Sequence, residues 1–191
     1  MIDGEFETFL TELKSKKTKL KEKQMKKQSQ ITLYTTRGAL IAALYVVLTL
    51  LSSAMGLSSG VIQFRFSEAL CILPLFFPEA IPGLYVGCLL SNLIAGGNVW
   101  DVIFGSLATL IGAVGARLLT CLPHKLKWIS TIPTILANMI IVPLVLIYAY
   151  GAPDSFFFLM ATVGIGEIVC AGIGGGGLYY LMKKHEKQWL K

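Results

Sequence analysis

Residues 38–57 read GALIAALYVVLTLLSSAMGL, twenty positions without a charged side chain. A helix of about 20 apolar residues crosses the hydrocarbon core of a bilayer. The stretch is too long for the apolar core of a signal peptide, and further apolar runs follow it. We therefore expect an uncleaved first span of a polytopic membrane protein.

Five more apolar runs follow, at 61–77, 79–95, 102–122, 128–150 and 156–182. The first two of these are short and are interrupted by Pro74, Pro78 and Pro82, which predicts kinked or irregular helices. Breaks of this kind survive in a membrane where protein or a cavity satisfies the freed backbone groups. The fold class expected is an all-α integral membrane protein, a bundle of six transmembrane helices.

Composition supports this class, because 54% of the 191 residues are hydrophobic, 15% are charged and the mean hydropathy is +0.67. Such a balance excludes an ordinary water-facing surface. The net charge of +6 comes from lysines near the chain ends and in one loop. This distribution indicates the orientation of the chain in the membrane, and no nucleic-acid partner is expected. The four cysteines stand far apart in apolar runs, so packing is favoured over a metal or disulfide site, and no cofactor is expected.

Basic residues also predict the orientation, because short cytoplasmic loops retain Lys and Arg. Of the 17, nine lie in the stretch up to Arg37, and four follow the sixth run. Three more lie where the fourth run ends and the connection to the fifth begins: Arg117, Lys125 and Lys127. Both termini are therefore expected in the cytoplasm of a bacterial cell.

The predicted organisation is a Lys-rich cytoplasmic leader at 1–36, a membrane domain at 37–183 and a cytoplasmic tail at 184–191. Met25, which precedes KKQSQ and the first span, is a candidate second start site.

Ionisable residues inside a membrane are costly, so each one is a functional candidate. Arg65 and Glu68 lie three residues apart near the predicted outer start of the second helix, where they would share one helical face. They would either pair with each other or line an outward-facing cavity together with Gln63.

Two polar residues on different helices lie at matching depths. Asn138 lies twelve residues before the outer end of the fifth run, and Glu167 eleven residues after the outer start of the sixth. At about 1.5 Å per residue, both lie roughly 17 Å below the outer boundary and can face one ligand or each other. Asn92, Trp100 and Asp101 add polarity and an aromatic ring at the same mouth, although Asp101 would also suit a helix N-terminus.

Small residues four apart, Ala39 with Ala43, Gly38 with Ala42 and Gly83 with Gly87, permit close helix packing. The sequence holds no catalytic triad, metal-ligand cluster, dinucleotide fingerprint or phosphate loop, so no enzyme is expected.

The segment VIQFRFSEALCILPLFFPEAIPGLYVGCLLSNL (61–93), followed by WDVIFGSLATLIGA (100–113), resembles the QueT family of S components of energy-coupling factor transporters. The likeness covers nearly the whole chain after the leader. Ala39 and Ala43 are similar to the AxxxA motif by which such S components contact a coupling subunit. The leader departs from the compact start of the family.

The resemblance implies a membrane subunit that binds a queuosine precursor, a 7-deazaguanine base or queuine, from outside and releases it inside. It also implies a coupling transmembrane subunit and two ATPases as partners. In this interpretation Glu167 accepts two N–H groups of the base, and Asn138 or Arg65 donates to its carbonyl. Trp100 stacks on the ring, and Glu68 or Asp101 meets a cationic arm. The alternatives are an S component for riboflavin, thiamine or another vitamin, and a membrane scaffold without a ligand.

Overall fold

The computed structural model describes residues 2–58 and 62–185, and helices are the only regular structure in that part of the chain. Contacts divide the chain into two units, Met1–Thr36 and Arg37–Lys191, with the boundary inside the long helix α1 (Ile2–Ala54). In the first unit, all described side chains from Lys16 to Thr36 are exposed.

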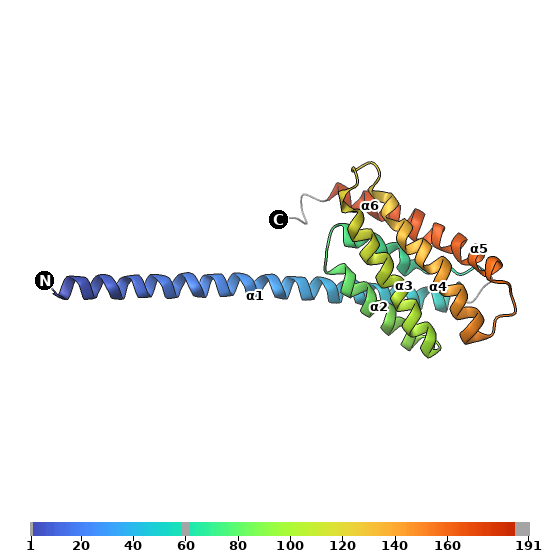
Figure 1. Ribbon diagram of the computed structural model, residues 1–191, viewed down its shortest axis with the longest axis horizontal. Coiled ribbons are helices and arrows are strands. Elements are labelled where there is room, and N and C mark those ends of the chain that lie inside the picture. The colour runs from blue at the N-terminus through green and yellow to red at the C-terminus, as the bar shows by residue number, and fades with distance from the viewer. Residues whose placement is uncertain (1, 59–61, 186–191) are drawn as a thin grey trace. The chain divides into compact units, whose positions relative to one another are not determined.

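The second unit is a helical bundle in which α3 packs between α2 and α4, and α4 packs against α5 (Figure 1). After α1, its elements are η1 (Phe66–Leu75), α2 (Ala80–Ile94), α3 (Val99–Leu118), η2 (Leu119–Cys121), η3 (Lys127–Thr131), α4 (Ile132–Tyr150), α5 (Phe156–Glu167), η4 (Ile168–Gly174) and α6 (Gly175–Lys184).

Four helical stretches of the described chain are long and apolar enough to cross a membrane: Lys16–Ala54, Val99–Cys121, Lys127–Tyr150 and Phe156–Lys184. Large apolar side chains are exposed along all four, as expected for surfaces in contact with lipid. The all-helical membrane class predicted from sequence is thus confirmed.

The second and third runs form shorter helices, Phe66–Leu75 and Ala80–Ile94. The second is a 3₁₀ helix containing Pro74, and at about 2 Å per residue it rises only ~20 Å. Six crossings therefore remain a prediction.

The second run, expected to form a kinked or irregular helix, is not helical at residues 62–65, and residue 61 lies outside the described residues. Arg65 has extended dihedral angles (φ −115°, ψ 101°). Arg65 and Glu68 therefore do not share one face of a regular helix. The cause is long-range: Phe66 N–H donates to Ser52 Oγ of α1 at 3.0 Å, and Phe64 N–H donates to the Leu57 carbonyl.

Close packing of α1 on α2 follows from the small-residue pattern. A Cβ added to Gly87 of α2 would lie 2.8 Å from Tyr45 Cβ and 2.9 Å from the Ala42 carbonyl oxygen of α1. A Cβ added to Gly83 would lie 2.6 Å from the Gly38 carbonyl oxygen. These glycines bring α1 near enough for Tyr45 to reach the interior, where it is fully buried.

The last apolar run is one helix that changes its hydrogen bonding part-way. An α-helical segment ends at Glu167, a π-helical segment follows over Ile168–Gly174, and α6 continues the helix. Short π-helical segments inside α-helices occur frequently at functional sites. Of the predicted C-terminal tail, residues 186–191 lie outside the described residues.

Candidate functional site

Glu68 on η1 is a buried carboxylate held by three donors from three elements. It is 2% exposed. The Tyr45 hydroxyl of α1 donates to its Oε1, while Cys71 Sγ and Asn138 Nδ2 lie 3.2 and 3.5 Å from its Oε2. The two contacts at Oε2 involve a weak thiol donor and a long amide contact.

Glu167 at the end of α5 is the second buried carboxylate, 7% exposed. Its Oε2 is fully buried without a hydrogen-bond partner. A buried acceptor left open is expensive in a native protein and therefore calls for an explanation, such as a ligand that supplies the missing donor.

A small, partly open cavity joins these groups. Its volume is about 10 Å³, close to the room of a single water molecule. The lining combines five polar and two apolar residues: Gln63, Arg65, Glu68, Asn138, Val142, Val163 and Glu167. The structure thus brings together five of the eight substrate-site candidates, from η1, α4, α5 and the segment before η1.

One glycine explains how the non-helical segment reaches this cavity. The Gln63 carbonyl oxygen lies directly against Gly166, where a Cβ would overlap with it. A residue with a side chain at 166 would push residues 63–65 away from Glu167.

Arg65 supplies the positive charge at the cavity. No salt bridge joins it to Glu68, so the alternative of a closed pair between them is not observed. The guanidinium of Arg65 lines the same cavity as the carboxyl groups of Glu68 and Glu167. The cavity therefore keeps donors and acceptors that the protein does not fully pair internally.

Asn92 and Asp101 are not among the residues that line the cavity. Asn92 Nδ2 lies 3.4 Å from the Asp101 carbonyl oxygen, and Asp101 Oδ2 accepts from the Tyr150 hydroxyl at 3.4 Å. Asn98, not Asp101, caps α3, because its side chain accepts from Trp100 N–H. These contacts tie the start of α3 to the end of α4.

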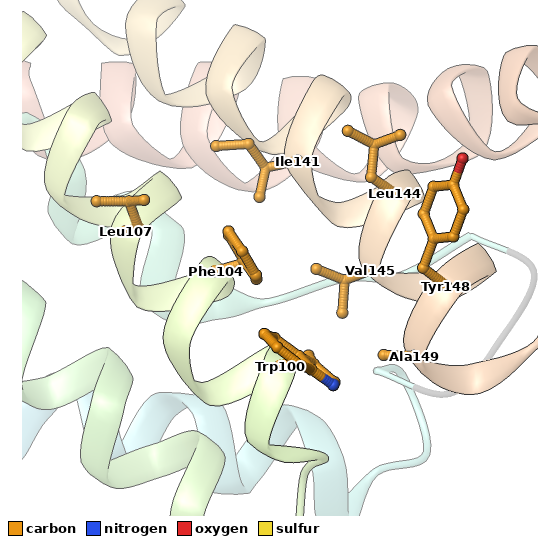
Figure 2. A pocket seen from close by; sticks show the side chains of 8 residues that line it. All are labelled: Trp100, Phe104, Leu107, Ile141, Leu144, Val145, Tyr148 and Ala149. Atoms are coloured by element: carbon orange, nitrogen blue, oxygen red, sulfur yellow. The ribbon is translucent and has the colours of Figure 1, made fainter.

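Trp100 also points elsewhere. Figure 2 shows it with Phe104, Val145 and Tyr148 around a pocket of about 610 Å³ between α3 and α4. Trp100 is 56% exposed and stacks on Phe104 with 6.0 Å between ring centroids. None of the described residues that line this pocket is charged. An open apolar groove of this kind suits lipid chains and offers little to a ligand rich in hydrogen-bond donors.

Ala39 and Ala43 lie on an exposed face of α1, whereas Gly38 and Ala42 face α2. The alanine pair is therefore available to a neighbour in the membrane. Tyr45, by contrast, was not expected at the site from sequence, since an aromatic residue in an apolar run is usually a packing residue. The available signal was its hydroxyl, a polar group inside the predicted span.

Residues 35–184 match the family model described as QueT transporter. The chain belongs to the QueT transporter family. A protein of Lactococcus lactis subsp. cremoris (strain MG1363), named "Queuosine precursor transporter QueT", is 30% identical over 158 residues, which cover 78% of this chain and 91% of that protein. No solved structure matches.

Membership of the QueT family and the long apolar helices together make the chain a multi-pass protein of the cell membrane. The family resemblance read from the sequence is confirmed. The family consists of transporters, which agrees with the expectation that the chain is not an enzyme.

Proposed function

We propose that this chain is the substrate-binding S component of an energy-coupling factor importer for a queuosine precursor. The observation that carries the proposal is the buried, unpartnered Oε2 of Glu167, at a cavity where Arg65, Glu68 and Asn138 meet. The name of the Lactococcus relative supplies the ligand class.

The hydrogen-bonding pattern of a 7-deazaguanine fits this site. Its ring N–H and exocyclic amine lie side by side, so one carboxylate can accept both. Glu167 takes this role because its Oε2 is open. Arg65 or Gln63, both half-buried at the cavity, donates to the base carbonyl. Asn138 orients the carboxylates through its contact with Glu68.

The cavity as described is too small for a base, because small-molecule pockets usually measure about 300–1,000 Å³. In the proposed cycle, binding of a base therefore widens the cavity. A ligand that makes contacts only in the wider form shifts the population toward it.

In the membrane, the proposed arrangement has six crossings with both termini in the cytoplasm. The leader at 1–36 and the tail at 184–191 then face the cytoplasm. The ligand enters from outside, and the coupling subunit docks on the exposed face of α1 that carries Ala39 and Ala43. Two ATPases bound to that subunit supply the energy for release inside.

Isothermal titration of the purified full-length chain with 7-deazaguanine, guanine and riboflavin tests the ligand class. The proposal predicts saturable binding of 7-deazaguanine and no binding of riboflavin. Binding of riboflavin alone would assign a different vitamin, and no binding of any of the three would overturn the proposed ligand class.

A further inference from the structure

A second groove, with a volume of about 450 Å³, runs between α4 and the last helix of the chain. One wall comes from η3 and α4 and includes Trp128 and Ile135, and the other comes from η4 and α6 and includes Ile168 and Tyr180. None of the described residues that line it is charged. Both walls belong to helical stretches long and apolar enough to cross a membrane, so the groove opens toward lipid.

Glycines keep this groove open. A Cβ added to Gly176 or Gly177 would meet no atom of another element within 4 Å. Both glycines line the groove, just after the π-helical segment Ile168–Gly174. Apolar walls with nothing between them forgo dispersion contacts, and a hydrocarbon chain in the groove supplies those contacts.

The length of the groove fits one acyl chain. From Ile168 to Tyr180 the helix advances by roughly 18 Å, at about 1.5 Å per residue. Half of the hydrocarbon core of a bilayer measures about 15 Å. The wall therefore has the length that a lipid chain covers in one leaflet.

Three lysines stand at one end of the groove. Lys127 directly precedes Trp128, and Lys183 and Lys184 follow Tyr180 by three and four residues in α6. Residues three and four apart lie on the same side of a helix. Lys183 and Lys184 are exposed, and Lys127 is half-buried.

The two sources of these lysines are held together. η3 contacts α6, and the Tyr179 hydroxyl of α6 donates to the His124 carbonyl at 2.9 Å. Within the described part of the chain, none of the three lysines forms a salt bridge. Three positive charges at the rim of an apolar groove are complementary to the head of an anionic lipid.

The groove between α3 and α4 provides a contrast within the same molecule. It is also apolar and also carries aromatic residues, Trp100 and Tyr148. The charged residue next to Trp100 in the chain is an acid, Asp101. That groove offers a lipid chain the same contacts but has no attraction for a negative head.

We propose that the groove between α4 and the last helix binds an anionic phospholipid. One acyl chain lies along the apolar walls, and the phosphate lies against Lys127, Lys183 and Lys184. Trp128 and Tyr180 lie between the two, at the level of the bilayer interface where such side chains are enriched. The site is separate from the cavity at Glu167, and the inference does not rest on the proposed function.

Two lipids with the same chains and different heads test the proposal. Native mass spectrometry would measure the lipid retained by the full-length chain from an equimolar mixture of dioleoyl phosphatidylglycerol and dioleoyl phosphatidylcholine. The expected result is one retained phosphatidylglycerol, favoured by at least about tenfold over phosphatidylcholine.

Neutralising the basic rim should remove this preference. In the triple variant Lys127→Gln, Lys183→Gln and Lys184→Gln, the ratio of the two retained lipids should fall toward one. The control changes the exposed Lys16, Lys17 and Lys19 to Gln, which removes the same charge from the leader and should leave the ratio unchanged.

Filling the groove should remove the lipid itself. Gly177→Trp places an indole where the chain leaves space, and retained phosphatidylglycerol should fall at least about tenfold. Leu181→Trp, at an exposed position of α6 outside the lining, is the control. Thermal unfolding of both variants shows whether the fold is kept, and the lysine variant tests the site independently of it.

Three results would overturn the proposal. The first is equal retention of the two lipids by the wild-type chain, or a preference that survives loss of the three lysines. The second is unchanged retention in a folded Gly177→Trp variant. The third is a dimer without bound lipid that Gly177→Trp converts to a monomer, which would assign the groove to a second copy of this chain.

Discussion

The Tyr45 hydroxyl of α1 donates a hydrogen bond to the carboxylate of Glu68, 23 residues later in the chain on η1. Both side chains are buried, and the same hydroxyl lies 3.5 Å from Thr109 Oγ1 of α3. Two further hydrogen bonds join α1 to the start of η1: Thr49 donates to Ser67 Oγ at 2.8 Å, and Ser52 Oγ accepts from the Phe66 amide. One face of α1 thus fixes the start of η1 and the carboxylate at the cavity.

Replacement of Tyr45 by Phe should loosen this connection without changing the shape of the core. Loss of one donor to a buried carboxylate is expected to lower stability by about 1–3 kcal/mol. Ligand affinity should fall by about tenfold, because Glu68 is no longer held in place. Thermal unfolding and titration in detergent measure both effects. Tyr180→Phe, at an exposed position of α6, is the matched control, and equal behaviour of the two variants would refute a special role for Tyr45.

Gly166→Ala should disturb the site through the backbone. The added Cβ would overlap with the Gln63 carbonyl, so residues 63–65 must shift away from Glu167. Overpacking of this kind costs about 1–3 kcal/mol, and ligand binding should weaken with it. In Gly177→Ala the new methyl group meets no atom within 4 Å, and this helical change should be neutral or slightly stabilising. Melting temperature and dissociation constant are the measurements, and unchanged binding by Gly166→Ala would contradict the close contact.

The double variant Ala39→Leu with Ala43→Leu should separate binding from assembly. Both alanines are exposed on α1, so larger side chains are accommodated in the isolated chain and ligand affinity should stay within about twofold. A close helix interface with the coupling subunit would be blocked. Co-purification with the coupling subunit and ATPases reads out assembly. Val114→Leu on an exposed part of α3 serves as the control, and normal assembly of the double variant would place the interface elsewhere.

Native cysteines give a direct test of orientation. Cys121 is exposed after α3, whereas Cys71, Cys88 and Cys170 are buried. With both termini in the cytoplasm, a membrane-impermeant maleimide should label Cys121 in inverted vesicles and not in intact cells. A cysteine introduced at Asp154, between α4 and α5, should show the reverse pattern. Labelling of both positions from the same side would exclude the proposed topology.

The long helices and the proximity of two candidate site residues were predictable from the sequence, because an α-helix rises by a fixed amount per residue. Counting residues from the ends of the fifth and sixth runs indicated that Asn138 and Glu167 lie at one level, and both line one cavity. Local periodicity was sufficient here because both residues lie in long, regular helical runs.

Other features depend on contacts that a local pattern does not contain. The extended conformation at Arg65 follows a hydrogen bond from the next residue to Ser52 on another element. Trp100 and Asp101 were expected near the ligand because they lie at the same end of the bundle. The sequence could not show that Trp100 faces the groove between α3 and α4, or that Asp101 bonds to Tyr150.

The most direct test of the central claim, that Glu167 binds the base edge of a deazaguanine, is a thermodynamic cycle between one side chain and one ligand group. Isothermal titration would compare 7-deazaguanine with 7-deazahypoxanthine, which lacks the exocyclic amine, in the wild-type chain and in Glu167→Ala. We expect the wild-type chain to prefer 7-deazaguanine by at least about tenfold, as for a hydrogen bond to a buried charged group, and Glu167→Ala to lose that preference. The same preference in both proteins would contradict the assignment of Glu167 to the ligand.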